Sequence, residues 1–214
     1  MKTITASILI TLFAIPAVTA ASTWNESVDA GDTLLSAQWT VGTGPLTQIT
    51  GILPHDADLD LFVIRITDAT NFKAWRYAAQ QTASDLGLFD ANGYGITHDD
   101  SVWNGQTLLT GAFVPGNGLY YLGISNEGAE AGSSGGLIWT SPLQIGERAP
   151  DGPGAAQPFT GWLSTGLNYD SVGYAIQLEG AEFAVVPEPS ALALLALGGV
   201  LLTRHWGRRR ALAA

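Results

Sequence analysis

The sequence predicts an all-β domain, an antiparallel and jelly-roll-like sandwich, for the central part of the chain. Segments 61–66, 119–124 and 174–179 have a period of two, in which one set of apolar residues alternates with the residues between them, and in 174–179 this gives one apolar and one polar face. This period is the signature of strands. Clusters of Gly, Asn, Asp and Pro separate these segments, and no long stretch keeps a helical period. Many short strands between turn signals favour a sandwich.

The remaining strands are expected where short apolar segments lie between turn residues. They are segments 34–40, 46–52, 72–79, 85–90, 106–114, 136–145 and 159–164. Residues 146–158 contain three prolines and three glycines, a composition that predicts a long surface loop.

The first 21 residues have the pattern of a secretory signal peptide. Lys2 supplies the positive charge, residues 4–18 are mostly apolar, and small residues follow at 18–21. Cleavage by signal peptidase is expected after Ala20 or Ala21. The mature domain is therefore assigned to residues 22–184.

The C-terminal segment, residues 185–214, combines an apolar stretch with a basic cluster. Residues 191–202 are uninterrupted apolar sequence, and the segment 189–206 approaches the roughly 20 residues that span a bilayer. The basic cluster that follows would hold its flank on the cytoplasmic side; it consists of Arg204, Arg208, Arg209 and Arg210. A single transmembrane helix at about 189–206 is predicted, with the domain facing outward.

A short proline motif precedes this helix. Pro187 and Pro189 fix their own φ angles and push Val186 and Glu188 towards extended backbone. A protease binds its substrate in extended form, so the strip has the shape of a cleavage or recognition site. A plain juxtamembrane linker is the alternative interpretation.

The order of motif, apolar helix and Arg-rich tail (residues 204–210) closely resembles the PEP-CTERM sorting signal of Gram-negative bacteria. The motif residues are Val186, Pro187, Glu188, Pro189 and Ser190. The resemblance implies export across the inner membrane and handling by an exosortase, a membrane cysteine protease. It further implies a final location at the cell surface or in the extracellular matrix, linked to exopolysaccharide and biofilm.

The domain itself is strongly acidic and has no cysteine. Between residues 22 and 184 there are four basic and 18 acidic residues, a net charge of −14. Such a surface repels nucleic acid and attracts divalent cations. Because disulfides are absent, the fold must depend on apolar packing, with or without bound ions.

Several stretches resemble the bacterial pre-peptidase C-terminal-like β-sandwich. They are "HDADLDLFVIRITDATNFKAW", "SDLGLFDANGYGITHDDS", "LTGAFVPGNGLYYLGIS" and "VGYAIQLEGAEF". That family implies a non-catalytic accessory domain, often attached to secreted enzymes.

Two acidic turns could bind calcium, which takes about six to eight oxygen ligands. Asp56, Asp58 and Asp60 recur at every second residue, and Asp90 and Asn92 lie in an Asp-Ala-Asn-Gly turn. The alternative is that these are ordinary turns, since Asx-Gly is common in hairpins.

Catalysis has little support in the sequence. His55 and His98 lack the spacing of a zinc site, and Ser101 next to His98 and Asp99 resembles a catalytic triad only in composition. We therefore expect no enzymatic activity, with hydrolysis a distant third possibility.

Tryptophans favour a different activity, sugar binding. Trp103 and Trp162 lie near turn residues and are the candidates for an exposed sugar-binding face, whereas most tryptophans are expected in the core. The sequence thus predicts a structural or adhesive surface protein, and a carbohydrate-binding module is the alternative.

Overall fold

The computed structural model describes residues 22–54, 58–77, 84–100, 106–126, 129–140, 146–164 and 171–184. Every regular element in these ranges is a strand. The signal peptide, the sorting segment, Asp56 and Trp103 lie outside them. The strands are β1 Thr23–Asn25, β2 Gln38–Trp39, β3 Gln48–Leu53, β4 Leu59–Ile66, β5 Lys73–Tyr77, β6 Ser84–Asp90, β7 Gly95–Asp100, β8 Gln106–Thr110, β9 Gly118–Asn126, β10 Ala129–Ser133, β11 Gly136–Leu137, β12 Phe159–Ser164, β13 Val172–Glu179 and β14 Ala181–Phe183.

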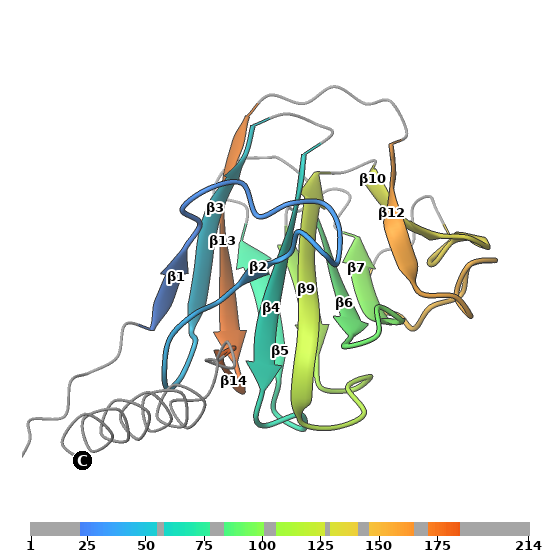
Figure 1. Ribbon diagram of the computed structural model, residues 1–214. Helices are drawn as coiled ribbons and strands as arrows, with labels where there is room; N and C mark the ends of the chain where they lie inside the picture. The colour runs from blue at the N-terminus through green and yellow to red at the C-terminus, as the bar shows by residue number, and fades with distance from the viewer. Residues whose placement is uncertain are drawn as a thin grey trace, which may run out of the picture.

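Two large sheets form the sandwich (Figure 1). One has the order β1-β3-β13-β5-β8, and the other has the order β14-β4-β9-β6-β7. Successive strands pass from one sheet to the other, as β3 to β4, β4 to β5 and β8 to β9 do. This alternation is what a jelly-roll-like sandwich requires, and the all-β prediction is confirmed.

The sheets are mixed, so the prediction of a wholly antiparallel sandwich is wrong. β1 pairs with β3 in parallel, and β2 pairs with β4 in parallel. Parallel neighbours need a crossover connection instead of a hairpin. The chain supplies two such crossovers. The connection from β1 to β3 passes through β2 on the opposite sheet, and the connection from β2 to β4 passes through β3.

The main core lies between the two large sheets. In β13, Tyr174, Ile176 and Leu178 are buried, while Ala175 and Gln177 are partly exposed. This strand therefore has one buried and one more accessible face, as its alternating sequence predicts. The same face packs against apolar residues of β3, β4 and β9.

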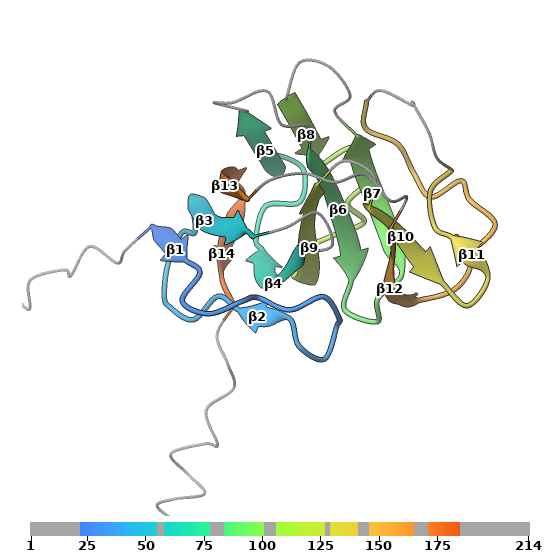
Figure 2. The same ribbon diagram turned by 90° about the horizontal axis from the view of Figure 1, so that it is seen from above.

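A second apolar core lies on the outer face of the β4 sheet. The small sheet β11-β10-β12 contributes residues to this core and lies at the side of the molecule nearest β6 and β7 (Figure 2). Leu61, Val63 and Phe89 from the large sheet pack there against Trp139 and Phe159. Strand β4 is consequently buried on both faces. Segment 136–145 was predicted as one strand; of its described residues, 136–140, only the two of β11 are in a strand, and 141–145 lie outside the described ranges.

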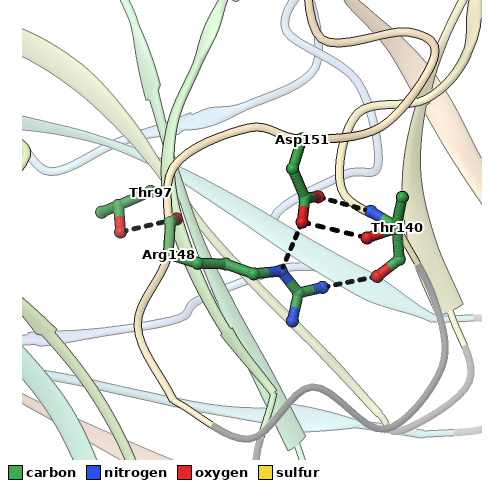
Figure 3. Close-up of polar contacts among 4 residues, drawn as sticks. All are labelled: Thr97, Thr140, Arg148 and Asp151. Carbon is green, nitrogen blue, oxygen red and sulfur yellow. Dashed lines mark hydrogen bonds and ion pairs between the residues drawn. The ribbon is translucent and has the colours of Figure 1, made fainter.

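The predicted loop 146–158 contains no strand, and polar contacts hold it against the second core. The backbone of Arg148 exchanges hydrogen bonds with that of His98, at 3.0 and 3.1 Å. Thr97 Oγ1 donates to the Arg148 carbonyl at 3.1 Å. Asp151 accepts hydrogen bonds from the Thr140 backbone N–H at 2.8 Å and its hydroxyl at 3.0 Å, beside the Arg148 guanidinium (Figure 3).

We expect Asp151→Ala to lower the free energy of unfolding by about 1 kcal/mol, because both hydrogen bonds to Thr140 are lost. The ion pair with Arg148, at 3.8 Å and partly exposed, should add little. Urea unfolding of the two proteins measures the difference. Asp151→Asn keeps one acceptor, so its free energy of unfolding should lie between those of the wild type and Asp151→Ala. An unchanged urea midpoint for Asp151→Ala would contradict this account of the loop.

Candidate metal centre

The two acidic turns singled out in the sequence lie at opposite ends of one sheet. Asp60 pairs with Ile124 of β9, whereas Asp90 pairs with Tyr120 of the same strand. Asp90 Oδ1 accepts the backbone N–H groups of Asn92 and Tyr94 at 2.8 and 2.9 Å. This carboxylate therefore already serves as the acceptor of an Asx turn.

The other turn joins a larger group of carboxylates. One oxygen from each of Glu26, Asp29 and Asp60 lies within 4.8 Å of the others, and the same holds for Asp29, Asp32 and Asp58. We call these five residues the acidic cluster. Asp29 belongs to both triplets, so the cluster is continuous.

Three members of the acidic cluster come from the N-terminal strap, residues 26–37, which connects β1 to β2. Hydrogen bonds attach this strap to both sheets. Glu26 Oε2 accepts the N–H of Ile52 in β3 at 2.9 Å, and the Gly31 carbonyl accepts the N–H of Leu61 in β4 at 3.3 Å. The strap thus crosses the edge of the sandwich with its carboxylates facing the beginning of β4.

Asp60 is the more deeply buried of the two buried members of the acidic cluster, the other being Asp58. The Asp60 side chain is 0% exposed, and the Tyr174 hydroxyl of the opposite sheet donates a hydrogen bond to Oδ2. Its other oxygen, Oδ1, is buried and has no hydrogen-bond partner within the protein. Buried polar atoms are nearly always paired in folded proteins, and one without a protein partner commonly contacts a bound ion or water.

The electrostatics of Asp60 reflect this position. Burial raises the pKa of its carboxyl to about 8; the Tyr174 hydrogen bond opposes the rise, and the charges of Glu26 and Asp58 add to it. Burial and the nearby Asp60 carboxylate raise the pKa of the Tyr174 hydroxyl as well. Without a cation, the site therefore favours a proton on Asp60 at neutral pH.

A glycine allows the acidic cluster to form. A Cβ atom at Gly51 would lie 2.2 Å from the Tyr174 hydroxyl and 2.3 Å from Glu26 Oε2. Any side chain there would displace one of these two groups. The close approach of the strap to β13 thus depends on glycine at this position of β3.

The chemistry of the acidic cluster suits a hard divalent cation. It offers carboxylate oxygens only, with no His or Cys among its members. Calcium takes about six to eight oxygen ligands in flexible geometry, whereas magnesium demands a near-ideal octahedron. Two triplets of carboxylates that share Asp29 fit the looser calcium geometry better, and a cation at the triplet of Glu26, Asp29 and Asp60 would satisfy Asp60 Oδ1.

Sequence reasoning identified Asp58 and Asp60 but missed Glu26, Asp29 and Asp32. Their spacing, an acidic residue at every third position, was visible in the sequence. That spacing does not reveal which other segment of the chain the strap contacts. That pairing depends on the parallel β2–β4 contact, which the sequence did not predict.

The other predicted residues lie elsewhere. Trp162 is partly buried and packs in the second core, with ring centroids 6.3 Å from Phe89 and 5.1 Å from Phe159. His98 is buried and stacks on Trp139 at 5.0 Å. Burial lowers the pKa of His98 to about 3, so this imidazole is neutral. Ser101 and His55 lie outside the described residues.

Comparison with known families identifies the C-terminal segment. The PEP-CTERM protein-sorting motif matches residues 185–211, which include the Val-Pro-Glu-Pro-Ser sequence. The match indicates an exported surface protein that an exosortase processes. No curated protein matches the chain. Among the described residues there is no helix long and apolar enough to cross a membrane, and the predicted span 189–206 lies outside them.

The pH dependence of stability tests the role assigned to Asp60. Its pKa is about 8 in the folded chain and about 4 when unfolded. The folded chain therefore holds a proton that the unfolded chain has lost, and wild-type stability should fall as pH rises from about 4 to about 8. Asp60→Asn should remove this component and be the more stable protein at the upper end of that range.

Melting temperatures in a chelator across that range measure the effect. Asp99 and Asp100, whose pKa values burial also raises, contribute to both profiles and cancel in the difference. Parallel profiles for the wild type and Asp60→Asn would contradict the assignment.

Proposed function

We propose that the chain is an exosortase-processed surface protein with a non-catalytic, structural role in the extracellular matrix, and that calcium closes its β-sandwich. The sorting motif supports the location. The observation that carries the calcium proposal is the acidic cluster, with the unpartnered oxygen of buried Asp60 inside it.

Calcium would act as a clamp at the sandwich edge. The strap contributes Glu26, Asp29 and Asp32, whereas Asp58 immediately precedes β4 and Asp60 is its second residue. Only the folded chain brings both groups together, so the cation binds the folded state selectively and stabilises it by mass action. A domain without disulfides gains a cross-link in this way.

The compartment matches this chemistry. Extracellular calcium sites commonly bind with dissociation constants of about 0.1–1 mM. A clamp of that affinity would fill after export, when the acidic domain has left the cytoplasm. The strap would then close the sandwich on the far side of the membrane from the site of synthesis.

Calcium is expected to raise the melting temperature of the wild type relative to a chelator. At a concentration 100 times the dissociation constant, the gain is about 2.7 kcal/mol, or roughly 5–10 °C for a domain of this size. Asp58→Asn and Asp60→Asn should lose most of this shift. Differential scanning calorimetry measures it directly.

Asp90→Asn is the matched control, because it removes one charge from the other acidic turn and keeps an oxygen acceptor for the Asx turn. It should retain the full calcium shift. If the wild type melts at the same temperature in calcium and in chelator, the clamp is refuted, and the surface location is unaffected.

Processing of the C-terminus is tested separately. Replacing Pro187, Glu188 and Pro189 with alanine should leave the Arg-rich tail on the protein and keep it in the membrane fraction. The wild type should appear in the medium without that tail. The intact mass of the protein from the membrane and medium fractions shows whether the tail is retained. Glu182→Ala, which removes a carboxylate outside the motif, is the control and should be processed as the wild type is.

A further inference from the structure

A groove of about 520 Å³ lies beside β1, at the edge of the sandwich. We call it the edge groove. Its apolar lining comes from Trp24, Val41 and Phe183. Trp24 and Phe183 pack against the main core, whereas Val41 is 54% exposed. Among the described residues, no charged side chain lines the groove, although the domain carries a net charge of −14.

The free edge of β1 forms one wall of the edge groove. β1 is the outer strand of its sheet, and both the Ser22 carbonyl and the Glu26 N–H bond to β3 and the residue before it. Because backbone groups alternate in direction along a strand, those of Thr23 and Asn25 point away from β3. Both residues line the groove, although their side chains lie on the outer face of the sheet and bond to side chains of β3. The groove therefore offers backbone donors and acceptors beside its apolar lining.

The chain leaves the domain at this groove. β14 ends at Phe183, which lines the groove, and the next N–H, that of Ala184, donates to Thr40 Oγ1 at 3.1 Å. β14 reaches only as far as Ile64 of β4, because β2 pairs with the two preceding residues of that strand. Residue 185 must therefore turn away from β4, and it begins beside the groove.

The segment that follows has the composition of an extended strand. Residues 185–187, Val-Val-Pro, lie outside the described residues and carry no charge. β-Branched valine favours strand conformation, and Pro187 restricts Val186 to extended backbone. Because the segment is attached to the chain beside the groove, its effective concentration there is high, and a weak intrinsic affinity is enough for occupancy.

From these features, we propose that residues 185–187 occupy the edge groove as an extended strand beside β1. The valine side chains cover Trp24 and Val41, and their backbone pairs with the free edge, which is a general mode of peptide addition to a sheet. The sorting motif, residues 186–190, is thereby held against the domain, and a protease reaches it only after release. This last consequence rests on the exosortase processing proposed above.

Amide hydrogen exchange of the full-length chain in detergent tests the docking. In the wild type, the amides of Val185 and Val186 should exchange at least about tenfold more slowly than in Val41→Asp, which places a charge in the apolar lining. Because Val41 is 54% exposed, this substitution should leave the fold intact. Mass spectrometry of a peptide that contains residues 185–190 measures the rates. Equal rates in the two proteins would overturn the proposal.

Leu163→Asp is the matched control, because Leu163 is 50% exposed and lies on β12, outside the edge groove. Its residues 185–190 should exchange as in the wild type. Thr43→Asp, at a second exposed position of the lining, should give the same faster exchange as Val41→Asp. It carries the test if Val41→Asp unfolds, and circular dichroism checks that each variant is folded.

Protein concentration distinguishes the occupant, because an intramolecular contact does not depend on it. Protection that disappears on dilution would place a strand of a second copy in the groove and contradict the proposal.

The effect on processing is measured separately, by a pulse of labelled amino acid in the cells that make the protein. Val41→Asp should lose its Arg-rich tail sooner than the wild type, and equal rates would refute the withholding of the motif. If neither protein loses its tail, exosortase processing itself is refuted, whereas the exchange experiment still decides whether the segment docks.

Discussion

Five carboxylates meet where the N-terminal strap crosses β4, and their mutual repulsion governs whether the edge of the sandwich can close. Like charges at such short range, with one member fully buried, are costly unless a proton or a cation compensates them. The strap also brings β2 onto β4 and positions Gln38 to hold Trp24. The acidic cluster, the parallel pairing and the hydrogen bond between Trp24 and Gln38 therefore depend on the same contact.

The second feature that organises the domain is the double burial of β4. Phe62, Ile64 and Ile66 face the main core, while Leu61 and Val63 face the second core. A strand covered on both faces reads as a continuous apolar segment. The small sheet and the loop 146–158 supply the second cover, and contacts of Arg148 and Asp151 hold that loop in place.

Local pattern predicted the strands well where one face remains accessible. Segment 159–164 matches β12 residue for residue, and the alternation at 174–179 is the observed burial pattern of β13. β10 was not predicted, because its sequence, Ala-Glu-Ala-Gly-Ser, has no strand-favouring residues. Its strand conformation comes from pairing with β12, which is a tertiary contact.

The candidate site was only half predictable for a related reason. Asp58 and Asp60 are two residues apart at the entry to β4, so their spacing suggested an oxygen-rich site. Glu26, Asp29 and Asp32 reach them from about 30 residues away in the chain; only the crossover from β1 to β2 brings them there. The two acidic turns lie towards opposite ends of β9 because of the strand register, which pairs Asp60 with Ile124 and Asp90 with Tyr120. Composition does not predict that register.

The attachment of the last strand has a mechanical consequence. Ala184 is fully buried, and its N–H donates to Thr40 Oγ1, which in turn donates to the Val63 carbonyl. β14 pairs along β4 through residues 181–183. Tension applied from the C-terminal side enters the domain through these bonds and passes directly into its most buried strand. A pull along β14 loads them in shear, so they share the force instead of yielding one after another.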